Sequence, residues 1–216
     1  MKKVILLSIS LIFLFTASMW AQKFPATLKK HNGSEMSGVV TLPKNTEKTI
    51  TFTSAGGAIK IPSTDIALMT LFNDEGGVWA ELEYVPVFSQ RSSSIGKFDK
   101  IETNLWLIVI LRGSATLYST HYSAYISGYQ LPEFFHYCRR EGEKGAVMIA
   151  TSSPSPTSFG HTKLFKKYAS TYFADDPMTI DVIKNGNFKN KDLLGQIVPV
   201  IEDYNSRHES VNKGQK

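Results

Sequence analysis

Cysteine is almost absent from this chain: Cys138 is the only one among 216 residues. A single cysteine cannot form an internal disulfide, so a disulfide-stapled miniprotein is excluded and stability must come from a hydrophobic core. His136 lies two positions away, and on a strand both side chains would share one face, which leaves a thiol–histidine pair as an alternative. That spacing is common by chance, so we expect Cys138 to be a buried structural residue.

Long apolar runs are also scarce, and the most prominent one begins the chain. A charged start at residues 1–3, a mostly apolar run at 4–15 and small residues at positions 17, 18 and 21 have the pattern of a signal peptide. We expect residues 1–21 to be removed by cleavage between Ala21 and Gln22. Because no cysteine lies near that junction, the lipid-modified cysteine of a bacterial lipoprotein is missing. The exported chain would then be soluble, without a transmembrane anchor, in the periplasm or at the cell surface.

The other strongly apolar run is the seven-residue segment Leu105–Leu111. It is too short to cross a bilayer as a helix, which takes about 20 residues. Its length and its β-branched residues are typical of a strand that is buried on both faces.

The chain has little excess charge of either sign. It carries 24 basic and 19 acidic residues, and removal of Lys2 and Lys3 with the leader leaves 22 basic residues in a chain of 195. With 42% hydrophobic residues, such a chain is not a disordered polar tail. Its near-neutrality also excludes a nucleic-acid binder driven by bulk charge.

Catalytic and metal-binding motifs are missing as well. The five histidines, at positions 31, 121, 136, 161 and 208, have none of the close spacings that bring two metal ligands together. There is no Gly-x-Ser-x-Gly elbow and no phosphate-binding glycine loop. The sequence therefore predicts neither a metal site nor a cofactor, and it offers no catalytic residue.

Glu81 and Glu83 are the one carboxylate pair that could act as acid and base. On a strand they share a face, with Cβ atoms about 7 Å apart. The two carboxylates of glycosidases normally flank a cleft from different strands. A solvated strand face is therefore the favoured interpretation.

Turn signals divide residues 22–151 into short segments that alternate as strands do. Asn32-Gly33 predicts a hairpin with a type I′ turn, in which both central residues have positive φ. Residues 89–100 predict a connecting loop or a lid. Residues 134–140 predict a strand or, as an alternative, a short helix. We expect eight to ten strands, at residues 24–30, 35–42, 49–53, 58–61, 67–72, 78–87, 105–111, 114–122, 134–139 and 146–151.

Beyond a Ser/Pro linker at residues 152–161, the apolar period changes to that of helices at residues 162–207. Asp176-Pro177 predicts a capped helix start, and Asn185-Gly186 predicts its end. Pro199 predicts a kink or a division into two helices. Residues 208–216 are polar and predict a disordered tail. The fold class is α+β: a curled or barrel-like β-rich sheet followed by about three C-terminal helices that dock onto it.

Two surfaces are candidates for binding. The segment 118–137 is rich in aromatic residues, which can stack on sugars or lipids but also build β cores; its candidate ligand surface consists of Tyr118, Tyr122, Tyr125 and Tyr129. Three lysines on one face of the first helix could meet an anionic surface, although a solvated helix face is the simpler interpretation. These are Lys163, Lys166 and Lys167.

Several short motifs occur in an order that resembles a group of uncharacterised exported proteins of Bacteroidetes-type bacteria. They are Ala21-Gln22, Gly33 with Gly38-Val39-Val40, Ile50-Thr51-Phe52, Ile61-Pro62 with Asp65-Ile66, Gly113 to Tyr118, Tyr172-Phe173 with Asp175-Asp176-Pro177, and Tyr204-Asn205. The resemblance implies export and a β-rich part followed by a helical part. It implies no activity, ligand or catalytic residue.

These observations favour a non-enzymatic envelope protein that binds a ligand or a partner, such as an envelope protein, a glycan or a lipid, but not nucleic acid. Two alternatives stay open: an exported hydrolase whose site residues are scattered in sequence, and a structural subunit of a surface assembly. A cavity in the β-rich part would support ligand binding. A cleft that gathers a histidine and two carboxylates would support the hydrolase.

Overall fold

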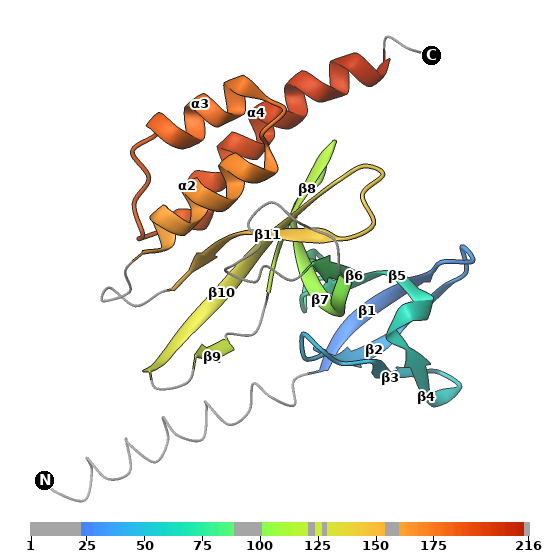
Figure 1. Ribbon diagram of the computed structural model, residues 1–216. Helices are drawn as coiled ribbons and strands as arrows, with labels where there is room; N and C mark the ends of the chain where they lie inside the picture. The colour runs from blue at the N-terminus through green and yellow to red at the C-terminus, as the bar shows by residue number, and fades with distance from the viewer. Residues whose placement is uncertain (1–22, 89–100, 121–123, 127–128, 154–159, 214–216) are drawn as a thin grey trace, which may run out of the picture. The chain divides into compact units, whose positions relative to one another are not determined.

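The computed structural model describes residues 23–88, 101–120, 124–126, 129–153 and 160–213 (Figure 1). The predicted signal peptide, the 89–100 loop and residues 154–159 of the predicted linker lie outside this part of the chain. The chain divides into two compact units, Met1–Pro43 with Lys48–Trp79, and Lys44–Glu47 with Ala80–Lys216. The division therefore falls inside the segment predicted as one β-rich domain and not at the Ser/Pro linker. The helices belong to the second unit because they share a core with its strands.

The first unit is an antiparallel sheet with strand order β4-β3-β2-β1-β5. Its elements are β1 (Lys23–Lys30), β2 (Glu35–Thr41), β3 (Thr49–Ser54), β4 (Gly57–Pro62), the short 3-10 helix η2 (Ser63–Asp65) and β5 (Ile66–Phe72). Buried residues such as Leu28, Phe52 and Met69 form its core. Gly38 allows β2 to pass close to β3, because a Cβ there would lie 2.3 Å from Thr53 O and 2.8 Å from the Phe52 ring.

The hairpin between β1 and β2 is confirmed, but the predicted type I′ turn is wrong. Gly33 has φ of 84°, whereas Asn32 does not have positive φ. Gly33 N donates to Lys30 O at 3.0 Å and Lys30 N donates to Ser34 O at 2.8 Å, which is a three-residue loop with one left-handed glycine. The Asn32 side chain accepts from Ser34 N at 3.0 Å, so Asn32 stabilises the loop through its side chain and not through positive φ.

The second unit contains a mixed sheet with strand order β6-β7-β8-β10-β11. Its strands are β6 (Val78–Phe88, from Ala80 onward in this unit), β7 (Ile101–Leu111), β8 (Ala115–Ser119), β10 (Tyr129–Arg140), β11 (Ala146–Ser152) and β9 (Ala124–Ile126), which pairs with β10. β11 also reaches β6 through two parallel residue pairs, so the sheet is curled as expected, although it is not a closed barrel. β10 confirms a strand at 134–140 and contradicts the helical alternative.

Successive residues of the second sheet point to two different cores, as strand geometry requires. Tyr118 and Tyr137 lie on the face that also carries Val85 and Leu107. Leu117 and Cys138 lie on the opposite face and pack against the helices. Both faces are filled by buried side chains.

Three helices follow the second sheet: α2 (His161–Tyr172), α3 (Pro177–Asn185) and α4 (Leu193–Lys213). They lie together in Figure 1, and α2 packs against β11. Asp176 caps α3 as predicted, since its carboxylate accepts from Met178 N and Thr179 N, and Gly186 ends the helix. Pro199 lies inside α4, which continues through it as one helix. The predicted division into two helices is therefore wrong.

α4 also extends further than the polar composition of its end predicted. It runs to Lys213, and the His208 ring stacks on Tyr204 with centroids 4.0 Å apart. Residues 208–213 are thus helical and not a disordered tail. The α+β fold class, with a β-rich part followed by three helices, is confirmed. Among the described residues, no helix is both long and apolar enough to span a membrane.

Candidate functional site

An open pocket of about 330 Å³ lies at one end of the second unit's sheet. The start of β8, the end of β10 and the turn after β10 form its walls. Its lining residues are Gly113, Thr116, Arg139, Arg140, Glu141, Gly142 and Glu143. The lining therefore combines two arginines with two glutamates around a small volume.

The turn after β10 carries the two glutamates, which line the same pocket as the arginines. Gly142 has φ of 82°, which glycine adopts without steric cost. Glu143 N donates to Arg140 O at 3.2 Å, and the Glu143 carboxylate accepts from Arg140 N at 2.8 Å. Glu141 N donates to Ser114 O at 3.0 Å. These bonds hold the turn against the start of β8.

Arg139 is the cationic group of the pocket that keeps unused donors. Its Nη2 donates to Glu83 Oε2 at 3.1 Å, and its guanidinium lies 5.5 Å from the centre of the Tyr118 ring. No other bond from this side chain is seen among the described residues, although a guanidinium has five N–H donors. With the side chain 31% exposed, Arg139 is held in place and still accessible.

Glu83 links Arg139 to a cluster of charges on neighbouring strands. Its Oε1 accepts from Arg112 at 2.6 Å, and its Oε2 also accepts from Tyr118 OH at 2.8 Å. Arg112 donates two further bonds, of 3.0 and 2.8 Å, to Glu81 Oε2. Burial and the nearby Glu83 carboxylate raise the pKa of Tyr118. The phenol therefore stays a donor to Glu83.

The structure brings Glu81 and Glu83 together, as strand spacing predicted, but as acceptors for one arginine. The Glu83 side chain is 13% exposed, whereas those of Glu81 and Arg112 are 34% and 47% exposed, so this face is partly open to solvent and is covered only around Glu83. Arg112 and Arg139 could not be assigned to this pair from the sequence because they come from other segments of the chain. Burial of a carboxylate requires a charged or hydrogen-bonding partner. A glutamate on an otherwise apolar strand face is therefore a weak indication that a basic side chain lies nearby.

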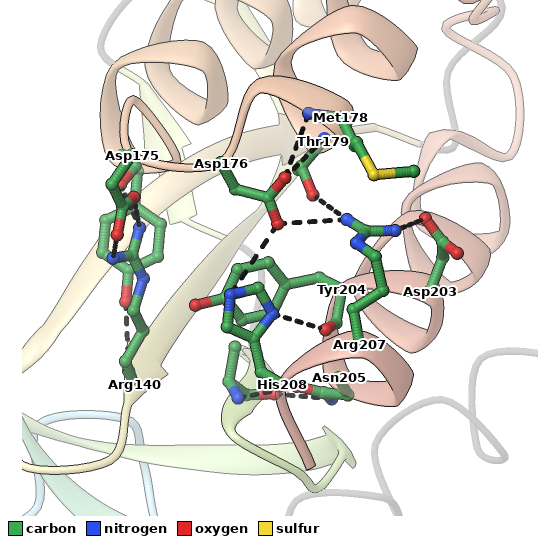
Figure 2. A network of polar contacts seen from close by, with 12 residues as sticks. Arg140, Asp175, Asp176, Met178, Thr179, Asp203, Tyr204, Asn205, Arg207 and His208 are labelled. Atoms are coloured by element: carbon green, nitrogen blue, oxygen red, sulfur yellow. Dashed lines mark hydrogen bonds and ion pairs between the residues drawn. The ribbon is translucent and has the colours of Figure 1, made fainter. Parts of the chain in front are cut away.

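Arg140 points to the other side and joins the sheet to the helices (Figure 2). Its guanidinium forms a bidentate pair with Asp175, with bonds of 2.8 and 2.9 Å, and also donates to Tyr172 O. It lies 4.7 Å from the centre of the Tyr172 ring and 5.2 Å from that of Phe173. Of the two arginines, Arg140 is therefore engaged in structure, and Arg139 is the one that keeps unused donors.

The predicted tyrosine surface is only partly within the described residues. Tyr118 is fully buried and belongs to the core, so it cannot serve as an exposed platform. The side chains of Tyr122, Tyr125 and Tyr129 lie outside the description. A stacked aromatic pair that the sequence did not single out lies in the first unit, where Trp79 is 49% exposed and stacks on Phe24 at 4.9 Å.

The three lysines of α2 are not equivalent. Lys166 Nζ donates to Lys184 O at 2.9 Å and lies 5.9 Å from the centre of the Phe188 ring. Lys163 and Lys167 are exposed. Contact with an anionic surface stays a prediction, with two exposed lysines to support it.

The lone cysteine is buried, and burial raises the pKa of its thiol to about 12. A thiol in that state is a poor nucleophile. His136 bonds Ser152 through Nε2 at 2.7 Å, and His161 bonds Thr151 through Nδ1 at 2.6 Å. Both rings are buried, so this pair of histidines joins β10, β11 and α2 inside the protein.

The feature that would support a hydrolase is a histidine close to two carboxylates in a cleft. His208 lies 3.9 Å from Asp176, but both carboxylate oxygens of Asp176 are already bound, one to the amides that begin α3 and the other to Arg207. Among the described residues, no group of three histidine, cysteine or acidic side chains could hold a metal ion. The pocket beside Arg139 is thus the candidate site that the geometry favours.

Comparisons of the chain with protein-family models, with curated proteins and with solved structures found no match.

Proposed function

We propose that this protein is an exported, non-enzymatic binding protein of the cell envelope, and that it holds a small charged ligand in the pocket beside Arg139. The observation that carries the proposal is that Arg139 lines the pocket while, among the described residues, a single carboxylate, that of Glu83, is bound to its guanidinium. A fixed guanidinium with unused donors is a strong recognition group for anions.

The position of the pocket also limits the kind of ligand. Side chains fill both faces of the second sheet, including Leu107, Tyr137 and Ile149. Among the described residues, these two faces are therefore occupied by the protein's own side chains. The rim at the end of β8 and β10 offers a small polar space instead, at the lower end of the roughly 300–1,000 Å³ range of ligand sites.

The alternative of an exported hydrolase has one observation in its favour, the 2.7 Å bond between His136 and Ser152. His136 is 1% exposed, and within the described residues its Nδ1 has no hydrogen-bond partner to orient the ring. A serine nucleophile needs an oriented base that substrate can approach. Binding at the Arg139 pocket is therefore the better supported function.

Ligand binding is tested by two-dimensional NMR of the isotope-labelled protein against a panel of small molecules. The panel contains phosphate, sulfate, acetate, succinate, the common amino acids and amino sugars. We expect shifts of the Gly113, Thr116 and Gly142 amides with at least one member, and their loss in Arg139→Gln. If no member shifts these amides, the proposed function is wrong.

Export is tested by fractionating cells that express the full chain and sequencing the N-terminus of the recovered protein. We expect the protein in the envelope fraction with Gln22 as its first residue. Recovery of the intact chain from the cytoplasm would contradict export without affecting the pocket.

A further inference from the structure

We infer that His136 and His161 form a pH-sensitive switch, which keeps the start of α2 on the sheet at neutral pH and releases it in mild acid. His136 lies on β10, and His161 is the first residue of α2. Each ring contacts the end of β11, where Thr151 and Ser152 lie. None of these residues lines the pocket beside Arg139, so the inference does not depend on the proposed function.

The two rings are bonded to neutral groups of β11. His136 Nε2 lies 2.7 Å from Ser152 Oγ, and His161 Nδ1 lies 2.6 Å from Thr151 Oγ1. A serine or threonine hydroxyl can bond an imidazole but carries no charge. Neither of these two bonds therefore compensates a positive charge on its ring.

Burial makes such a charge costly. His136 is 1% exposed and His161 is 2% exposed. Within the described residues, Nδ1 of His136 has no hydrogen-bond partner. A protonated ring donates from both nitrogens. A proton on the closed, buried ring of His136 would therefore add a charge and an unpaired donor to the interior.

Hydroxyls, a thiol and a second imidazole surround His136. From β8 it faces Ser119, and Cys138 lies two positions along β10 on the same face. From α2 the ionisable group that acts on it is His161, whereas Lys163 in the same turn is exposed. Burial, followed by the charge of His161, lowers the pKa of His136 to about 4. Both effects oppose protonation of the closed form.

The switch acts at the ends of two elements. Ser152 is the last residue of β11 and pairs with Phe134, and His161 begins α2. Element ends separate at a lower free energy than element centres. Further along α2, Phe165 is fully buried in the core that the helices share with the sheet. Separation of the first turn of α2 from the end of β11 is therefore the smallest opening that hydrates His136.

The sign of the pH effect follows from the two states of His136. In the open form the pKa of the ring returns to its ordinary 6.5, whereas in the closed form it is about 4. The open form therefore binds the proton more tightly, so the closed form is favoured above pH 6.5 and opening increases as the pH falls toward 4. Between about pH 7 and pH 5 the opening equilibrium should rise about 20-fold.

Native-state hydrogen exchange followed by NMR tests this opening. Leu164 N donates to Gly160 O at 3.0 Å across the first turn of α2, and Phe173 N donates to Ala169 O at 2.9 Å at the far end of the helix. Dividing each rate by that of an unstructured peptide at the same pH removes the intrinsic effect of pH. We expect the protection of Leu164 to fall about 20-fold between about pH 7 and pH 5, while that of Phe173 changes by less than about twofold.

Variants assign the effect to His136. His136→Gln should abolish the change at Leu164, because glutamine does not gain a proton in this range. His31→Gln, in the exposed β1–β2 loop, is the matched control and should keep the change of about 20-fold. NMR titration of the His136 ring in the unchanged chain provides a second measurement if His136→Gln does not fold, and we expect a midpoint of about 4.

Several results would overturn the inference. Equal loss of protection at Leu164 and Phe173 would mean that α2 opens as a whole, and constant protection at Leu164 would mean that its first turn stays closed in acid. A full change at Leu164 in His136→Gln would assign the opening to other groups. A titration midpoint at or above the ordinary 6.5 would show that the closed form does not oppose protonation.

Discussion

Asn205 of α4 pairs with both backbone groups of Ala115, the first residue of β8. Its Oδ1 accepts from Ala115 N at 2.7 Å and its Nδ2 donates to Ala115 O at 2.9 Å. The residues of β7 that pair with β8 extend only as far as Leu111, opposite Leu117, so the side chain of Asn205 takes the place of a neighbouring strand. This contact joins the last helix to the sheet (Figure 2).

Asn205→Ala would leave both backbone groups of Ala115 buried without a partner. We expect the free energy of unfolding to fall by about 2–4 kcal/mol, since each unsatisfied buried group costs about 1–3 kcal/mol. Urea unfolding followed by circular dichroism measures the change. Ser206→Ala, on the exposed side of the same helix, is the control and should change stability by less than about 0.5 kcal/mol.

Gly113→Ala provides a second check of the same contact. A Cβ at Gly113 would lie 2.3 Å from Asn205 Nδ2, so the two substitutions should not add. In a double-mutant cycle we expect a coupling of about 1 kcal/mol or more between them. Additive effects would contradict the direct packing of Gly113 on Asn205.

Asp176 stabilises α3 and depends on its charge to do so. Burial by itself raises its pKa, but hydrogen bonds from Thr179 N and from Arg207 outweigh this effect, and the native pKa lies below the ordinary 3.8. The contribution of the ionised group is therefore complete above pH 3.8 and is lost as the pH falls through the lower native pKa. Asp176→Ala should cost about 1–2 kcal/mol near neutral pH, as a lost helix cap does.

The measurement for Asp176 is urea unfolding at several pH values, for the unchanged chain and for Asp176→Asn. The amide keeps an acceptor for Met178 N and Thr179 N but has no charge to lose. We expect a smaller drop in stability in acid for the amide variant. Identical pH dependence in both chains would show that the carboxylate charge does not contribute.

His136 should make the protein less stable as the pH falls. Burial, with a smaller effect of nearby His161, lowers its pKa from 6.5 to about 4. Between these values the unfolded chain binds a proton that the folded chain does not, so stability is present above pH 6.5 and is lost as the pH falls toward 4. The full shift corresponds to about 3 kcal/mol.

The pH effect of His136 is measured by unfolding at pH values between 4 and 7. His136→Gln should flatten the pH dependence, since glutamine does not titrate in this range. His31→Gln, in the exposed β1–β2 loop, is the control and should leave the slope unchanged. An equal slope in His136→Gln would assign the acid sensitivity to other groups.

Cys138 should not react in the folded protein. Its side chain is fully buried, and its raised pKa of about 12 keeps the sulfur protonated. Ellman's reagent at pH values near 8 should label no thiol in the native protein and one thiol in concentrated guanidinium chloride. Rapid labelling of the native chain would mean that this part of the β10 face opens to solvent.

Local patterns predicted most of the elements because the interactions that form them are local. Asp176-Pro177 begins α3 since the capping carboxylate reaches amides two and three residues away. The hairpin at Asn32-Gly33 was placed correctly for the same reason. The predicted turn type was wrong because Asn-Gly is compatible both with a two-residue type I′ turn and with a three-residue loop that has one left-handed residue. The register of β1 and β2 decides between these two turns.

The candidate site depended on contacts that no local pattern contains. Strand spacing placed Glu81 and Glu83 on one face, but Arg112 and Arg139 reach Glu83 from 29 and 56 residues away. The order β6-β7-β8-β10 determines which side chains meet across the sheet. The same order buries Tyr118, which its aromatic surroundings had suggested as part of a ligand surface.

The sequence alone determined the α+β class, the caps of α3, the strand at Leu105–Leu111 and the absence of an internal disulfide, because each follows from composition or from neighbours along the chain. The expected burial of that strand holds for residues 105–107, whereas residues 108–111 are only partly buried. Only the tertiary structure decided that the helices share a core with β8, β10 and β11, and that Arg139, Glu141 and Glu143 line one pocket. The physical reason is that strand order and register bring together residues from distant segments. A charged side chain that this arrangement buries, such as Glu83, must then pair with charges that other strands supply.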